Sequence, residues 1–239
     1  MCGRYALYGP KSRNNRETLR FYEQDIAFPP RYNLSPMQDL PVYCVDAEQG
    51  PKLMLMRWGF VPAWAKEPAK GAPLNNARAE TVAEKPTFRD AYRRRRCLVP
   101  MNGFYEWQRS GTQKTPYYIR MQDAELFAVA GLYEYWPGNL TSPMTTFAVL
   151  TTAANTLMEA IHDRMPVIVR RAAWDAWLDP QNRNAHGLDS LLQPYPTAEM
   201  HAHPVSSRVN SVRNDDDTLM EEAPASAILD PVPIQGQLL

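Results

Sequence analysis

The stretch CLVPMNGFYEWQ, residues 97–108, decides the fold class of this chain. β-Branched and aromatic side chains dominate it, and three stretches of the same character follow: TPYYIRM (115–121), LFAVAGLYEYW (126–136) and TTFAVLTTA (145–153). Such residues favour strands, and successive strands joined by short connections pair antiparallel. The central part of the chain therefore predicts an antiparallel sheet.

Shorter elements flank this sheet. Upstream, apolar runs at 40–45 and 53–60 surround the turn AEQGP, which predicts a hairpin. Helices are predicted at 16–25, 85–96, 155–162 (with Asn155 as N-cap) and 172–178, and further strands at 165–169 and 203–210. We therefore expect one α+β domain over residues 1–214. Residues 215–239, acidic and then rich in Pro and Ala, are predicted to form a loosely ordered tail.

Composition excludes several classes of protein. Hydrophobic residues make up 44% of the 239 residues, but no apolar run approaches the ~18–20 residues that a membrane span needs. The three cysteines show neither CxxC nor Cys/His spacing, so no disulfide framework and no metal site are expected. A Gly-rich phosphate loop is also missing, which argues against a nucleotide cofactor. With no signal peptide visible, we expect a soluble intracellular protein without a cofactor.

Charge is unevenly distributed along the chain. Residues 1–120 carry 20 Lys and Arg against 11 Asp and Glu, whereas residues 121–239 carry 6 against 15. A basic half is compatible with a phosphate-rich partner, and ordinary surface scatter explains it equally well.

Cys2 stands directly behind Met1, an unusual position for one of only three cysteines. Once Met1 is removed, the residue carries an α-amine and a thiol together. The amine condenses with an aldehyde to an imine, and the thiol then closes a five-membered thiazolidine ring. An unperturbed α-amine titrates near pH ~7.7–8.0, so a neutral fraction exists at physiological pH. The alternative is that Cys2 has no chemical role.

Four other stretches carry residues suited to such chemistry. His162 in IHDRMP follows a predicted helix and can shuttle protons near neutral pH, unless it is structural. Glu106 lies in an apolar strand, where it is either buried with a perturbed pKa or turned to solvent. Asn76 and Arg78 in NNARAET offer an amide and a guanidinium for a polar, phosphate-bearing reactant. Trp64 could stack on an unpaired base.

The ordered set of motifs MCGRY, RYNLSP, WGFVPAW, NARAET, GFYEW, IHDRMP and HPVSSRVNSVRN resembles the SRAP family, the SOS response-associated peptidases, over nearly the whole chain to about residue 214. The family fold is a β-rich pseudo-barrel of antiparallel sheets flanked by helices, with the N-terminus in a cleft. Members bind abasic sites in single-stranded DNA, also near duplex junctions, and form a thiazolidine crosslink that protects the lesion from strand cleavage.

The resemblance implies a role for individual residues. Cys2 would supply both nucleophiles, Glu106 would orient the amine and handle its proton, His162 would act as general acid and base in sugar opening and in slower crosslink reversal, and Asn76 would hydrogen-bond the sugar. The implied DNA ligands are Arg4, Asn33, Trp64, Arg78, Thr152 and Arg164. It further implies a monomeric bacterial protein of the cytoplasm, associated with the nucleoid. Family members carry a second aromatic after Trp64, where this chain has Ala65.

Two other functions remain open from the sequence. One is a cysteine-type hydrolase or autopeptidase, with Cys2 as nucleophile and His162 as base. The other is a non-enzymatic reader of single-stranded or modified DNA that uses the basic half and Trp64.

Overall fold

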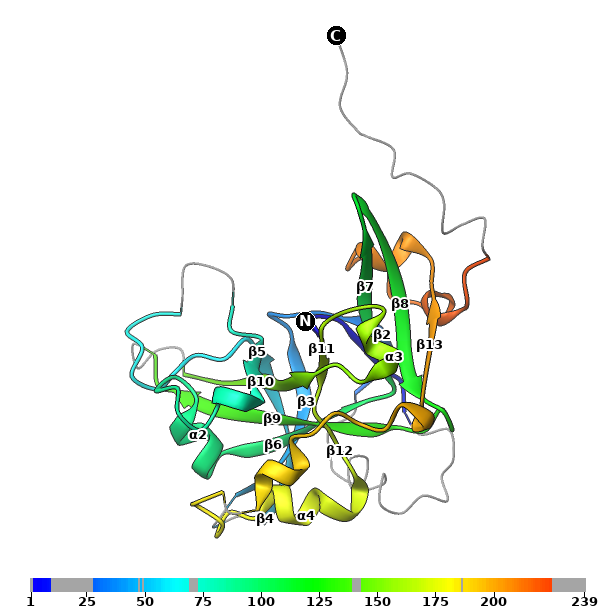
Figure 1. Cartoon of the computed structure of the whole chain (residues 1–239). Helices are drawn as coiled ribbons and strands as arrows, with labels where there is room; N and C mark the ends of the chain where they lie inside the picture. Colours follow the sequence, from blue (N-terminus) through cyan, green and yellow to red (C-terminus); the bar gives the residue numbers. More distant parts are fainter. Residues whose placement is uncertain are drawn as a thin grey trace.

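The computed structural model describes residues 2–9, 28–46, 48, 50–68, 73–138, 143–185 and 187–224. Its strands are β1 Tyr5–Leu7, β2 Arg31–Leu34, β3 Asp39–Asp46, β4 Gly50–Trp58, β5 Asn76–Arg78, β6 Arg96–Met101, β7 Gly103–Ser110, β8 Gln113–Met121, β9 Phe127–Trp136, β10 Met144–Ala153, β11 Arg164–Pro166, β12 Ile168–Val169 and β13 Met200–Pro204. The helices are α2 Arg89–Arg94, α3 Thr156–Glu159 and α4 Trp174–Leu178. Two sheets dominate the molecule (Figure 1). The predicted α+β class is confirmed.

The larger sheet closes on itself. Strand β4 pairs with β3, β3 with β6, β6 with β9 and β9 with β10, and β10 returns to β4. Most of these pairs are antiparallel, as predicted, but β10 runs parallel to β4 and to β5. The expected pseudo-barrel is thus present, and its main core includes the fully buried Trp58, Phe147 and Leu98.

The stretch CLVPMNGFYEWQ, residues 97–108, contributes to two strands that belong to two different sheets. Strand β6 belongs to the barrel, whereas β7 belongs to a second sheet of order β13-β8-β7-β1-β2. The corner is the buried Asn102, whose side-chain oxygen accepts from the Tyr8 amide (2.8 Å) and whose side-chain nitrogen donates to the Gly9 carbonyl (2.8 Å). Gly103 follows, and a Cβ there would overlap the Tyr118 ring. The corner therefore needs both residues.

Several predicted elements are confirmed and others are corrected. The hairpin forms as β3 and β4, Asn155 caps α3 through a 3.0 Å bond from the Met158 amide, and α4 lies within 172–178. The helix predicted at 85–96 is shorter, and the strand predicted at 165–169 divides into β11 and β12. The strand predicted at 203–210 is wrong in its second half, because Ser207–Asn210 is a 3₁₀ turn. The helix predicted at 16–25 lies outside the described residues.

The predicted loose tail is wrong for residues 215–224. The Asp215 carboxylate accepts from the Tyr32 and Asn33 amides at 2.6 and 2.9 Å and pairs with Arg31, and Leu219 is fully buried. Asp215 thus pairs with Arg31 and Asp216 pairs with Arg208 at 2.7 Å, and these ion pairs hold the segment against the domain together with the buried Leu219. Residues 225–239 lie outside the described part.

Helices in the described part are short. None of them is long and apolar enough to cross a membrane.

Asn33 on β2 ties the end of the domain to its beginning. Its Nδ2 donates to the carbonyls of Val209 (3.3 Å), Ser211 (3.0 Å) and Asn214 (2.7 Å), and its Oδ1 accepts from Arg4 (2.8 Å). The residue is 0% exposed. Losing it would remove all four of these hydrogen bonds at once, and Arg4 would keep its bond to the Val209 carbonyl.

We expect Asn33→Ala to lower the free energy of unfolding by about 2–3 kcal/mol, the range for removing one member of a buried hydrogen-bond network. Urea denaturation measures the loss. Asn184→Ala, at an exposed position, is the matched control. If both variants lose the same amount, Asn33 does not hold the 209–214 segment in place.

Candidate functional site

The pairing of β1 with β7 places the N-terminal residues beside Glu106. Tyr5 lies opposite Phe104, and the Tyr105 amide donates to the Arg4 carbonyl at 2.9 Å, one residue beyond the strand. Continuing this antiparallel register brings residues 2 and 3 alongside 106 and 107. Cys2 is only 1% exposed and belongs to the main core. A residue next to the chain start is therefore packed and ordered.

Glu106 is buried, with 3% of its surface exposed. It faces the same side of β7 as Phe104, two residues earlier, and thus the main core. Burial raises the pKa of the Glu106 carboxyl, and nearby positive charge, including that of His162, opposes this rise. The prediction of a buried carboxylate with a perturbed pKa is confirmed, and the solvent-facing alternative is wrong.

The charge of the Glu106 carboxylate affects the pKa of the Cys2 thiol. Burial raises the pKa of Cys2 far above its ordinary value, and the charge of Glu106 raises it further. The thiol is therefore protonated at neutral pH, and a base has to take its proton when it reacts.

His162 follows α3 and faces a pocket shared with Glu106. Its Nδ1 accepts from the Arg164 amide at 3.0 Å and lies 2.8 Å from the Asp163 carboxylate. The Gln108 side chain on β7 donates to the Ala160 carbonyl at 2.7 Å, which joins the strand of Glu106 to the end of α3. The pocket measures about 470 Å³ and is lined by Glu106, Trp107, Arg109, Lys114, His162 and Asn210.

Strand β5 carries Asn76 and Arg78 next to β10. Asn76 lies beside Val149 and Arg78 beside Thr151 in the parallel register, so both side chains leave the same side of the strand. The Asn76 Oδ1 is buried and has no hydrogen-bond donor among the described residues. A buried acceptor without a donor is costly, and a ligand hydroxyl would remove that cost. The Arg78 side chain is exposed.

Two of the predicted phosphate ligands are already engaged. Arg4 donates to Asn33 and to the Val209 carbonyl, both at 2.8 Å, and its guanidinium lies 5.8 Å from the centre of the Trp107 ring. Arg164 donates to both carboxylate oxygens of Glu80, at 2.6 and 2.8 Å. These contacts fix each guanidinium in place, and a phosphate would compete with Glu80 for Arg164.

The three lesser predicted contacts have different surroundings. Asn33 is fully buried beneath Arg4 and Thr152 is 5% exposed on β10, whereas Trp64 is 70% exposed. Of the three, Trp64 alone presents a large surface to a base. Asn33 instead holds the Arg4 guanidinium in place by accepting its hydrogen bond.

Sequence reasoning missed four residues that line the pocket: Trp107, Arg109, Lys114 and Asn210. Trp107 and Asn210 fall inside the quoted motifs GFYEW and HPVSSRVNSVRN, but nothing in the sequence indicates the 2.7 Å hydrogen bond between their side chains. Arg109 and Lys114 meet only because β7 and β8 form a hairpin.

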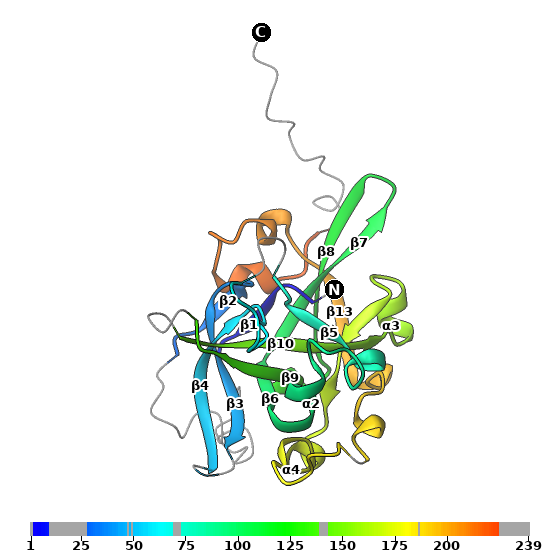
Figure 2. The same cartoon turned by 90° about the vertical axis from the view of Figure 1, so that its left-hand side faces the viewer.

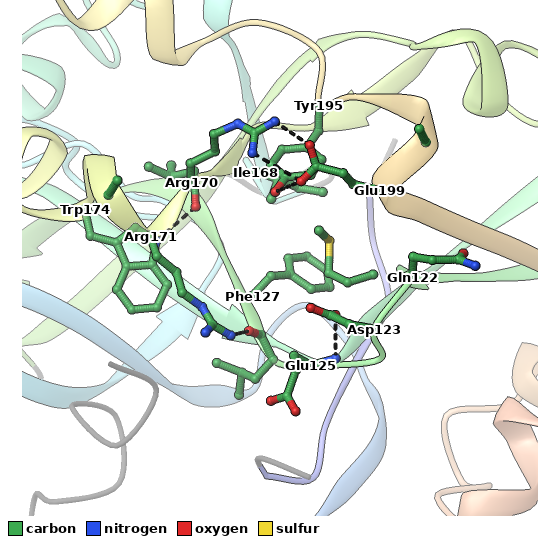
Figure 3. Close-up of a pocket in the computed structure, with 15 residues that line it drawn as sticks. Gln122, Asp123, Glu125, Phe127, Ile168, Arg170, Arg171, Trp174, Tyr195 and Glu199 are labelled. Atoms are coloured by element: carbon green, nitrogen blue, oxygen red, sulfur yellow. Dashed lines mark hydrogen bonds and ion pairs between the residues drawn. The ribbon is translucent and has the colours of Figure 1, made fainter. Parts of the chain in front are cut away.

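A larger cavity of about 610 Å³ lies elsewhere, between β8, β9, β12 and the segment before β13 (Figure 3). Arg170 pairs there with Glu199, and the Tyr195 hydroxyl lies 3.0 Å from the same carboxylate. Neither Cys nor His is among its lining residues. The Glu106 carboxylate, whose charge acts on Cys2, and the His162 imidazole thus both line the smaller pocket. In the described ranges, no three His, Cys, Asp or Glu side chains converge to hold a metal ion.

The chain is similar to several known proteins. The abasic site processing protein YoqW of Bacillus subtilis (strain 168) is 40% identical over 227 residues, which cover 92% of this chain and 99% of the relative. The abasic site processing protein HMCES of Xenopus tropicalis is 32% identical over 218 residues, covering 79% of this chain and 64% of its own length. A solved structure of a protein from Bacteroides thetaiotaomicron matches with a TM-score of 0.78 at 25% identity, over 93% of this chain and 100% of that one.

The family profile described as SOS response associated peptidase (SRAP) matches residues 1–212. This match spans both sheets and every residue of the pocket. The chain therefore belongs to the SRAP family.

Proposed function

We propose that this protein processes abasic sites in single-stranded DNA by forming a covalent crosslink through Cys2. The observation that carries the proposal is the burial of Cys2 beside the buried Glu106, which lines a pocket together with His162. The names of the relatives support the substrate, since they are abasic site processing proteins.

The chemistry needs no cofactor. After Met1 is removed, the α-amine of Cys2 attacks the aldehyde carbon of the ring-opened sugar, and water leaves as the imine forms. The thiol sulfur then adds to the imine carbon while the thiol proton ends on the nitrogen. The product is a thiazolidine that joins protein and DNA. The same steps in reverse break the crosslink and release both molecules.

We assign each neighbouring residue a role in these reaction steps. Glu106 accepts the proton of the α-ammonium and gives it to the hydroxyl that leaves as water, and it then carries the thiol proton to the imine nitrogen, for which its raised pKa is suited. His162 gives a proton to the sugar oxygen as the ring opens and returns it during slow reversal. The Asn76 oxygen accepts from a sugar hydroxyl. Arg4, Arg78 and Arg164 bind phosphates, and Asn33 holds Arg4 through its hydrogen bond. Thr152 is a lesser contact with the DNA, and Trp64 stacks on a base.

The proposal extends to the oligomeric state of the protein, its place in the cell and the form of its DNA substrate. The protein acts as a monomer in the bacterial cytoplasm, at the nucleoid. Exposed Trp64 would meet the end of a duplex where single-stranded DNA begins.

Intact-mass measurement tests the proposal directly. Protein incubated with a single-stranded oligonucleotide that contains one abasic site should gain the mass of the oligonucleotide minus one water, starting from a chain that lacks Met1. The same oligonucleotide reduced with borohydride has an alcohol in place of the aldehyde and should give no adduct. Equal adduct from both oligonucleotides would overturn the proposal.

The two alternative functions have less support. A cysteine peptidase needs a thiolate, whereas burial and Glu106 raise the pKa of the Cys2 thiol. A non-enzymatic DNA reader would leave the buried carboxylate of Glu106 next to the N-terminus without a purpose.

A further inference from the structure

The β7–β8 hairpin places two cations directly opposite each other. Arg109 on β7 and Lys114 on β8 are cross-strand partners, and both are exposed. Like charges in this position destabilise a hairpin. In the described part of the chain, neither side chain forms an ion pair with a carboxylate. The sequence thus holds two unneutralised cations together at a cost to stability.

These cations continue a row that begins at Arg4. Trp107 lies two residues before Arg109, so both point to the same side of β7. The Arg4 guanidinium lies 5.8 Å from the centre of the Trp107 ring, and the Trp107 indole donates to Asn210 at 2.7 Å. Cations that alternate with an aromatic ring are typical of surfaces that bind single-stranded nucleic acid.

The row also reaches the proposed reaction site. Glu106 leaves β7 on the opposite face from Trp107 and Arg109, yet Arg109 and Lys114 line the same pocket as Glu106 and His162. The hairpin rises beyond the rest of its sheet at one end of the molecule, while α4 lies at the opposite end (Figure 1 and Figure 2). A strand whose abasic sugar enters the pocket would therefore have its backbone close to the hairpin.

We propose that Arg109 and Lys114 together bind a backbone phosphate of the DNA strand that carries the abasic site. The phosphate would lie between the two cations and neutralise their mutual repulsion. This inference rests on the proposed function for its ligand. It adds a phosphate site on the smaller sheet, whereas β5 and Arg78 belong to the larger one.

Fluorescence anisotropy measures this binding without crosslinking. The probe is a single-stranded oligonucleotide with a tetrahydrofuran residue in place of the abasic sugar, because tetrahydrofuran has no aldehyde. The test variant is Arg109→Gln with Lys114→Gln. The control is Lys52→Gln with Arg183→Gln, which removes the same charge from β4 and from the loop after α4.

We expect about tenfold weaker binding by the test variant and less than about twofold by the control. The slope of log K against log salt should become shallower by about 0.7, the value for one phosphate contact on a single strand. The thermal midpoint should stay equal or rise, because the like-charge pair is gone.

The inference is overturned if the test variant binds with the affinity and salt slope of the unmodified protein. Adduct formation on true abasic DNA separates this failure from failure of the proposed function. Unmodified protein that forms adducts, with the test variant binding normally, rejects the hairpin site alone. A test variant that binds weakly, with no adduct from either protein, supports the hairpin site and rejects the crosslinking function.

Discussion

A Cys2→Ala protein should form no heat-stable adduct with abasic single-stranded DNA, a loss of at least about a thousandfold in the rate of adduct formation. The reason is chemical, because the thiol supplies the second bond of the thiazolidine. Denaturing electrophoresis after heating measures the loss. Cys44→Ala, which makes the same change at another buried cysteine, is the matched control and should crosslink normally.

The same variant separates the amine from the thiol. With Met1 removed, the Cys2→Ala protein would still offer an α-amine at its N-terminus, which can form an imine with the aldehyde. Borohydride added during the reaction should therefore trap an adduct with this variant, although heating without borohydride leaves none. Adduct that survives heat without borohydride in the Cys2→Ala protein would contradict the thiazolidine.

The sequence predicted the fold well where the chain signals strands locally. The segments at 115–121, 126–136 and 145–153 became β8, β9 and β10 because each is a continuous β-favouring run. It did not predict the corner at Asn102, since the division of 97–108 between two sheets depends on contacts with Tyr8 and Gly9, nearly a hundred residues away.

In the candidate site, too, residues in short motifs were predicted, whereas contacts made by tertiary structure were not. Glu106 and His162 were predicted because a carboxylate in an apolar strand and an imidazole after a helix are visible in short motifs. Partners brought by tertiary structure were not visible: Glu80 on Arg164, the complete burial of Asn33, and the meeting of Arg109 with Lys114. Each of these depends on which strands are neighbours.

Glu106→Gln should slow crosslinking about a hundredfold, the lower end of the range for losing a general base. In the unmodified protein, the crosslinking rate should fall as pH decreases through the raised pKa of Glu106, because the protonated carboxyl cannot accept a proton. The variant should lack this acidic limb. Single-turnover rates between about pH 4 and pH 8 measure both effects, and a variant with the unmodified rate and profile would remove Glu106 from the mechanism.

The stability of the same variant should change in the opposite direction. The folded protein raises the pKa of Glu106 above its ordinary value of 4.5, so the ionised carboxylate disfavours the folded state. The stabilising effect of the protonated form is complete below pH 4.5 and is lost as pH rises through the folded pKa. Glu106→Gln should therefore match the unmodified protein in thermal midpoint at low pH and exceed it at neutral pH.

A second buried glutamate shows whether these effects belong to the site. Glu134 on β9 is also buried, and burial raises its pKa too, but its carboxylate pairs with Arg95 at 2.6 Å. Glu134→Gln should alter thermal stability without slowing the crosslink. A gain in stability together with a loss of rate should thus be confined to Glu106, because that carboxylate is held at a cost to folding beside the residue that reacts.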